Sequence, residues 1–197
     1  MAVTIEDIKR LKDLTGVGLT EAKAALTEAN GDFDKALEAM RKKGLTRAEK
    51  RGERVASEGV IEAYVHSGRV GVLVEVNCET DFVARTEEFK NLAHDLALHI
   101  AAMNPAYVSA DDIPTEERER KTAEFTEKAK NEGKPDNMVQ QIADGMAKKY
   151  FAELCLMDQA FVKDPNTSVG ELVKAAGAKL GENIVVNRMA RLELGVN

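Results

Sequence analysis

Apolar residues recur every three or four positions in residues 4–44, the spacing that gathers side chains on one face of a helix. The pattern predicts three short helices whose N-caps are Thr4, Thr20 and Asp32. Because each helix has one apolar face, we expect a compact three-helix bundle with a small core. The predicted inner residues are Ile5, Ile8, Leu11 and Leu14 or Thr15, then Ala22, Ala25, Leu26 and Ala29, then Phe33, Ala36, Leu37 and Met40.

The apolar period changes from helical to alternating between residues 60 and 78. Val60–His66 has the composition of a strand, and Ser67-Gly68 is typical of a tight hairpin turn. The strand that follows has one apolar face, which predicts a half-buried antiparallel hairpin. That face consists of Val70, Val72, Val74, Val76 and Cys78.

Helical spacing returns after residue 86. Thr86 is placed to cap a helix that Asn104-Pro105 ends. A strongly charged helix begins at Pro114-Thr115, and Glu132–Pro135 turns the chain back, so residues from about 115 to 154 are expected to form a projecting helical hairpin. The return helix is marked by Met138, Ile142, Met146 and Tyr150.

The C-terminal part is expected to contain strand, helix and strand. Leu156–Val162 has an extended pattern, Ser168 and Glu171 form a capping box for a helix, and Ile184–Leu192 predicts a last strand. Helices and strands do not alternate strictly along the chain. The fold class is therefore predicted as α+β with a small, mainly antiparallel sheet.

The length of 197 residues accommodates two small domains. We expect a three-helix domain with a basic linker in residues 1–53 and a core domain in residues 54–197. Residues 1–54 have a net charge of +2 and the remainder a net charge of −8. The basic stretch 41–54 could bind nucleic acid, but no aromatic residue interleaves its charges, so a solvated helix end with a linker is favoured.

No arrangement of residues in the sequence indicates catalysis or metal binding. Cys78 and Cys155 lack disulfide or metal-ligand spacing, and His94 and His99, five positions apart, would lie on different faces of a helix. Gly16-Val17-Gly18 lacks the context of a phosphate-binding loop. We therefore expect no enzymatic activity, no cofactor and no metal. Without a signal peptide or an apolar stretch that could span a membrane, a cytoplasmic protein is expected.

One segment between the hairpin and the next helix is unusual. Residues 77–85 are expected to form a short exit loop or turn, yet they carry Phe82 and Val83 beside Asp81. Phe82 either folds back into the core or is presented to solvent as an aromatic wedge beside an acid. The residues alone favour the core interpretation.

Two long motifs resemble the bacterial elongation factor Ts family. Residues 75–85, with the sequence EVNCETDFVAR, are similar to the signature of this family. The resemblance begins in the first helices and continues to the last strand, so it covers essentially the whole chain. The other matching segments are Leu14–Gly18, Ala22–Leu26, Asn30–Asp32, Gly59–Glu62, Gly133–Pro135 and Gln159–Val162.

The resemblance implies a translation elongation factor that is the guanine-nucleotide exchange factor of the GTPase elongation factor Tu. The loop matching Thr80–Val83 reaches the partner's nucleotide site, where Asp81 and Phe82 would wedge between helices, disturb the magnesium ion and loosen the phosphate-binding loop. GDP would then leave and GTP could bind. The family's N-terminal bundle is ubiquitin-associated-like and packs on the partner's G domain. The positions that match this docking surface are Lys12, Leu19 and Thr20.

The resemblance also bears on assembly. The chain is shorter than many family members, which have two related core halves, and it keeps one composite core. Other short members imply a homodimer, which would give a two-plus-two complex with elongation factor Tu. His99 matches a region where a helix of the long forms contacts the partner.

Other functions stay open from the residues alone. A three-helix bundle also suits a module that binds ubiquitin-like folds or nascent chains without exchange activity. An RNA-binding protein would use Arg41–Arg54, although the charge of −8 beyond the linker argues against nucleic-acid binding by the core. An enzyme ranks last. The discriminating segment is Thr80–Arg85, which a simple binding module does not need.

Overall fold

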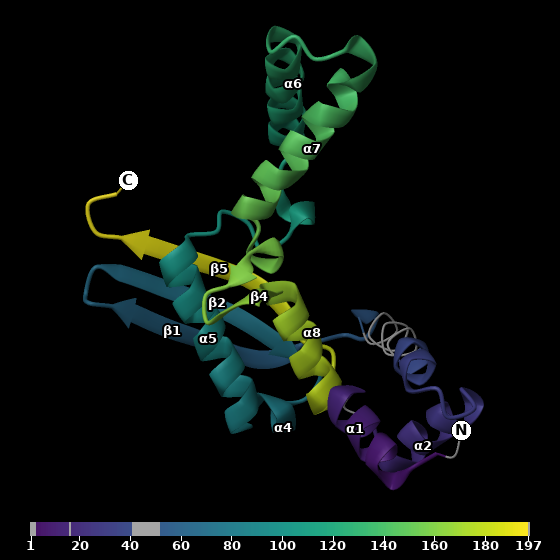
Figure 1. Ribbon diagram of the computed structural model, residues 1–197. Helices are drawn as coiled ribbons and strands as arrows, with labels where there is room; N and C mark the ends of the chain where they lie inside the picture. Colours follow the sequence, from purple (N-terminus) through teal and green to yellow (C-terminus); the bar gives the residue numbers. More distant parts are fainter. Residues whose placement is uncertain (1–2, 16, 41–51, 197) are drawn as a thin grey trace.

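The computed structural model describes residues 3–15, 17–40 and 52–196 of the chain (Figure 1). N-terminal helices are followed by a three-stranded antiparallel sheet, helices that cover one face of this sheet, and a helical hairpin that projects away from it. The predicted α+β class with a small antiparallel sheet is therefore confirmed.

The N-terminal helices are α1 (Ile5–Thr15), α2 (Leu19–Glu28) and a helix over residues 33–40. Two predicted caps are confirmed: the Asp7 amide donates to Thr4 Oγ1 (3.1 Å), and the Lys35 amide donates to Asp32 Oδ1 (3.1 Å). The helices share a small core of Leu11, Ala22, Ala25, Leu26, Ala36 and Met40. Of the predicted basic linker, residues 41–54, the part from 41 to 51 lies outside the described residues.

Three details of this bundle differ from the prediction. Thr20 is not an N-cap, because α2 begins at Leu19 and its N-cap is Gly18, whose carbonyl accepts from the Ala22 amide. Ile5 is exposed, since Val3 packs against the bundle core instead. Of the two residues predicted for the end of α1, Thr15 is half-buried, and Leu14 is exposed.

The central sheet has the order β1-β2-β5 and contains β1 (Glu58–His66), β2 (Val70–Cys78) and β5 (Val185–Glu193). Ser67 and Gly68 have φ values of 51° and 66°, which give the two-residue turn that suits twisted hairpin strands. Because side chains alternate along β2, one face of the sheet is apolar. The predicted hairpin and last strand are therefore confirmed, with Val72, Val74, Val76 and Cys78 buried.

Helix α5 (Glu87–Met103) lies across the apolar face of this sheet and forms the main core with it. Its predicted cap is confirmed, because Thr86 Oγ1 accepts from the Phe89 amide at 3.2 Å. The helix ends at Asn104, which has a left-handed conformation before Pro105. Phe89, Leu96 and Ile100 are fully buried against the sheet.

The projecting hairpin follows a short 3-10 turn, η1 (Ala110–Asp112), and consists of α6 (Thr115–Asn131) and α7 (Asp136–Leu154). The predicted hairpin is confirmed, but the buried face of α7 is shifted by one residue from the predicted stripe. Met138 is exposed. Most of the buried side chains of α7 are small, which allows the charged helix α6 to pack closely against it. The buried residues of α7 are Val139, Ala143, Ala147 and Phe151.

The C-terminal part contains η2 (Leu156–Asp158), β3 (Ala160–Phe161), β4 (Asp164–Ser168) and α8 (Val169–Leu180). The capping box of α8 is confirmed, because the Glu171 amide donates to Ser168 Oγ and the Ser168 amide donates to Glu171 Oε2. The predicted extended segment from residue 156 is wrong in its first half. There the Asp158 amide bonds to the Cys155 carbonyl, so the chain coils after α7 before it extends.

Candidate functional site

The unusual segment after β2 forms a single helical turn, α4 (Asp81–Ala84), between the end of β2 and the start of α5. Thr80 is its N-cap, and Thr80 Oγ1 accepts from the Val83 amide at 3.4 Å. The predicted exit loop is therefore a capped turn with a defined helical phase. Figure 1 shows α4 at the end of the core opposite to the projecting hairpin.

The helical phase of α4 decides which side chains face the protein. Ala84 is buried and Val83 packs against the main core, so the inward positions are taken. Phe82 lies on the outward side and is 80% exposed. The interpretation of Phe82 as a core residue is therefore wrong. An aromatic ring left in water forgoes about 1.5–3 kcal/mol of burial, so Phe82 adds little to the stability of the fold.

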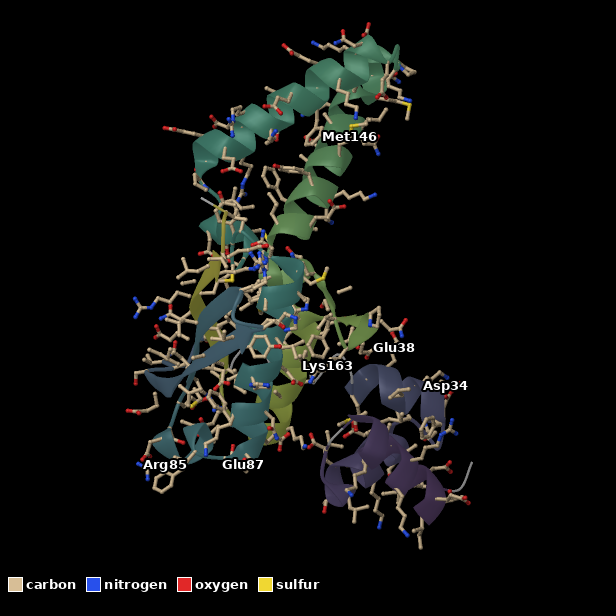
Figure 2. All side chains as sticks on the ribbon, turned by 90° about the vertical axis from the view of Figure 1, so that its left-hand side faces the viewer. Asp34, Glu38, Arg85, Glu87, Met146 and Lys163 are labelled. Atoms are coloured by element: carbon tan, nitrogen blue, oxygen red, sulfur yellow. The ribbon has the colours of Figure 1, made fainter. Side chains whose placement is uncertain are left out.

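Asp81 is adjacent to Phe82 but is not a free acid in this structure. Its carboxylate forms an ion pair with Arg85 across 2.8 Å, one helical turn further along the chain. Figure 2 places Arg85 beside Glu87 at the far end of the core from Met146 of the hairpin. Both side chains of the pair are largely exposed, and such pairs contribute about 0–1 kcal/mol, so Asp81 can exchange Arg85 for another partner at little cost.

The turn is anchored by residues from the loop between α8 and β5. Glu182 accepts hydrogen bonds from the amides of Glu79 and Thr80, and Asn183 donates its own amide to Glu79 Oε1. Sequence reasoning missed Glu182 and Asn183, because nothing local in the sequence links them to a segment about a hundred positions away. The sequence signal that could have indicated them is an acid followed by an amide residue, Glu182-Asn183, directly after the glycine that ends α8.

Cys78, at the end of β2, lies beneath the same turn. Its thiol is buried and donates to the Thr80 carbonyl across 3.2 Å. Burial raises the pKa of the Cys78 thiol, which keeps it protonated and unreactive. Its role is to pack under the turn.

The second set of predicted site residues lies on the N-terminal helices. Lys12 is near the end of α1, and Leu19 and Thr20 begin α2; all three are exposed. Leu14 is 59% exposed and Leu19 is 52% exposed, so apolar area is available around the connection of these helices. The sequence predicted Leu14 or Thr15 for the inner face of α1, and Leu14 is the exposed one of the two. These residues lie on α1 and α2, whereas Thr80–Val83 belongs to the turn that follows β2.

Comparison with known proteins decides the family. Residues 20–196 match the family model described as elongation factor TS. The chain belongs to the elongation factor Ts family. It is 49% identical over 194 residues to elongation factor Ts of Carboxydothermus hydrogenoformans. These aligned residues make up 98% of this chain and 89% of that protein. Elongation factor Ts of Herpetosiphon aurantiacus is 48% identical over the whole of both chains, and that of Moorella thermoacetica is 49% identical over 98% and 96% of the two chains.

Membership of the elongation factor Ts family makes this protein a translation elongation factor. Within residues 3–15, 17–40 and 52–196, no group of three or more His, Cys, Asp or Glu side chains could hold a metal ion. The same residues contain no helix that is long and apolar enough to cross a membrane.

His99, which the resemblance places near a partner contact in long elongation factor Ts chains, is fully buried in this chain. The Val162 amide donates to His99 Nδ1 (3.1 Å), so the ring proton is on Nε2 and faces Gln159 Oε1 (2.9 Å). Gln159 in turn donates to the Glu153 carbonyl (2.7 Å). His99 therefore joins α5 to the end of α7 and to β3, and it offers no atom to a partner.

The buried His99 ring should make stability depend on pH. Burial lowers the pKa of His99 below its ordinary value of 6.5, so the unfolded chain takes up this proton first as the pH falls. Below pH 6.5 the free energy of unfolding should therefore fall by up to about 1.4 kcal/mol per pH unit until the folded pKa is reached. The variant His99→Gln lacks this contribution. Urea unfolding of both proteins from pH 8 to about pH 5 measures this pH-dependent contribution. If the free energies of unfolding of the two proteins changed in parallel with pH, the prediction would be contradicted.

Proposed function

We propose that this protein is the guanine-nucleotide exchange factor of elongation factor Tu and promotes GDP release so that GTP can bind. The observation that carries the proposal is Phe82, 80% exposed on an anchored helical turn in a chain of the elongation factor Ts family. A protein of this kind binds no nucleotide, metal or cofactor itself and catalyses no covalent step. It would act in the cytoplasm, where translation takes place.

In this proposal Thr80–Val83 reaches the nucleotide site of elongation factor Tu. Phe82 enters between helices of the G domain, and Asp81 leaves Arg85 to disturb the surroundings of the magnesium ion. Once the ion and the phosphate-binding loop are displaced, GDP loses the contacts to its phosphates. The exposure of Phe82 and the weak pairing of Asp81 support these roles, because neither side chain gives up much native packing.

The energetics require more than the wedge. Weakening GDP binding by about 10⁴-fold corresponds to about 5.5 kcal/mol of differential binding. Burial of one phenylalanine side chain supplies about 1.5–3 kcal/mol, so Phe82 is insufficient alone. We assign the remainder to further contacts of the core (residues 54–197) and to docking of the N-terminal domain (residues 1–53). The docking residues are Lys12, Leu19 and Thr20, joined by Leu14.

The test is the release of fluorescent GDP from elongation factor Tu after addition of excess unlabelled nucleotide. The protein should accelerate release, and the rate should reach a plateau as its concentration rises. Unchanged release would refute the proposal and would favour the alternative, a binding module for ubiquitin-like folds or nascent chains without exchange activity. That alternative relies on the three-helix bundle of residues 4–44, whose exposed apolar residues include Ile5, Leu14 and Leu19.

We further propose that two copies pair through the uncovered face of the central sheet. Helix α5 covers the other face, while Ile61, Leu73 and Leu192 are 65%, 51% and 79% exposed on this side. A hollow of about 240 Å³ lies between Ile61, Leu73 and the ion pair of Glu75 with Arg188 (2.6 Å). Because this face carries both an acid and a base among apolar residues, it is complementary to itself under a two-fold axis. The dimer would present two exchange surfaces, as a two-plus-two complex requires.

Introducing a charge at the centre of this face should separate the copies. Leu73→Lys is expected to sediment as a monomer under conditions in which the natural chain is a dimer, because the lysine would be buried without a partner. Met138→Lys is the matched control, since Met138 is exposed on the projecting hairpin. Sedimentation equilibrium of the three proteins decides: a Leu73→Lys dimer, or a natural chain that is monomeric, would contradict the arrangement.

A further inference from the structure

Three hydrogen-bond donors from two consecutive residues converge on one carboxylate next to α4. Glu182 Oε2 accepts from the Glu79 amide (3.0 Å) and from the Thr80 amide (3.1 Å). Glu182 Oε1 accepts from the Thr80 hydroxyl (2.6 Å). Hydrogen bonds to an ionised acceptor are about twice as strong as neutral ones, so this carboxylate is a strong anchor for the residues that precede the wedge.

The contact is reciprocal, because Glu79 holds the loop that carries Glu182. Glu79 Oε1 accepts from the Asn183 amide (2.7 Å) and pairs with the Arg54 guanidinium (3.3 Å). The buried Asn183 side chain also donates to the Arg54 carbonyl (2.8 Å). We call Glu79, Thr80, Glu182 and Asn183 the clasp. It joins the end of β2 to the start of β5.

Two glycines, one inside α8 and one directly after it, bring Glu182 to this place. Gly181 ends the helix with φ of 79°, a left-handed conformation that turns the chain sharply. A Cβ at Gly177 would lie 2.9 Å from the Glu182 carbonyl oxygen, so a bare helix surface is needed for the loop to approach. A glycine inside a helix lowers stability by about 1 kcal/mol relative to alanine. The close approach of the Glu182 backbone explains why position 177 is nevertheless a glycine.

The clasp determines where Phe82 points. Thr80 is the N-cap of α4, and its hydroxyl has one proton: when that proton goes to Glu182, the lone pairs of Oγ1 face the Val83 amide. Glu182 thereby holds the hydroxyl in its capping orientation. A single turn of helix has no stability of its own, so its direction depends on such anchors. Without Glu182 the turn can rotate or fray, and the ring of Phe82 loses its fixed direction.

We propose that Glu182 is the positioning residue of the exchange wedge. The inference rests on the proposed exchange function and deepens it: Glu182 acts through Thr80 and Phe82, and its hydrogen bonds to the residues before the wedge set the maximal rate of GDP release. Positioning errors of about 1 Å lower rates by up to about 100-fold in pre-organised sites, so we expect a large effect from the half-buried Glu182.

The experiment measures maximal GDP release from elongation factor Tu at saturating factor, together with the melting temperature of each variant. Glu182→Ala should lower the maximal rate by about 10-fold or more. Glu182→Gln should stay within about a factor of 3 of the natural chain, because its amide oxygen accepts from both backbone amides and its amide nitrogen donates to Thr80 Oγ1. Glu171→Ala is the matched control. It removes a carboxylate that accepts from the Ser168 amide and hydroxyl at the other end of α8, and should leave the rate unchanged.

Two further variants keep the test decisive. Gly177→Ala leaves every hydrogen-bonding group in place but pushes the backbone of Glu182, so release should slow even if Glu182→Ala fails to fold. In a Phe82→Ala background, Glu182→Ala should cause a much smaller loss than in the natural chain, because most of its effect passes through the missing ring.

A natural rate in folded Glu182→Ala or Gly177→Ala would overturn the inference. So would equal losses in Glu182→Ala, Glu182→Gln and Glu171→Ala, which would indicate general destabilisation. A natural chain that fails to accelerate release would refute the proposed function, and the inference with it. A natural chain that accelerates release beside an unaffected Glu182→Ala refutes the inference alone.

Discussion

Replacing Phe82 by alanine is expected to slow maximal GDP release from elongation factor Tu by about 30-fold or more, the effect of losing a contact worth about 2 kcal/mol or more at the centre of an interface. The same change should hardly alter stability. The ring is 80% exposed and gives up little native packing, and exposed substitutions change the free energy of unfolding by about 0.5 kcal/mol or less. Stopped-flow GDP release and thermal unfolding of the same preparation measure both effects.

Phe89 provides the matched control, because it is the same residue type seven positions later and is fully buried. Phe89→Ala should cost about 3–5 kcal/mol of stability, as large-to-small changes in a core do. A Phe82→Ala protein that melts as early as Phe89→Ala, with normal exchange by its folded fraction, would show that Phe82 stabilises the fold and is not a wedge.

A chain that begins at Gly52 should fold but bind elongation factor Tu at least about 10-fold more weakly. The main core lies within residues 58–186 and shares no buried residue with the core of the N-terminal helices, so its stability should survive. The loss of affinity follows from the removal of Leu14 and Leu19, because burial of one leucine side chain contributes about 1.5–3 kcal/mol. Calorimetric titration against nucleotide-free elongation factor Tu measures the affinity.

Single substitutions in the full chain show whether the docking surface is where we place it. Leu19→Ser should reproduce part of the loss. Ile5→Ser should not, although Ile5 is also exposed, because it lies at the other end of α1. Equal affinity of the shortened and full chains would remove the docking role of residues 1–53.

The parts of the fold with a regular apolar period could be predicted from the sequence. The alternation from Val70 to Cys78 fixes which face of β2 is buried, and Thr86 with the acids that follow marks the start of α5. Both signals are local and strong. Short elements gave weaker signals: β4 consists of four polar residues and a proline, and the chain from Leu156 forms a 3-10 turn that continues the coil of α7.

The candidate site could be predicted only in part. The motif around Asp81 and Phe82 marks the segment, but the direction of Phe82 depends on the capped turn of α4, and the residues alone favoured burial. Thr80 owes its orientation to Glu182, which stands 102 positions further along the chain. Such a contact exists only after β2 and β5 have paired, so no local pattern contains it.

In the proposed mechanism, this protein promotes GDP release because it binds most tightly to elongation factor Tu whose contacts to the nucleotide are weakened. The two binding equilibria are linked. If this protein lowers the affinity of elongation factor Tu for GDP by a given factor, GDP lowers the affinity of elongation factor Tu for this protein by the same factor. The most direct measurement is therefore the dissociation constant of this protein from elongation factor Tu without nucleotide and with saturating GDP and magnesium. We expect GDP to weaken the complex by the same factor by which the protein weakens GDP binding. Equal dissociation constants in the two conditions would contradict the account.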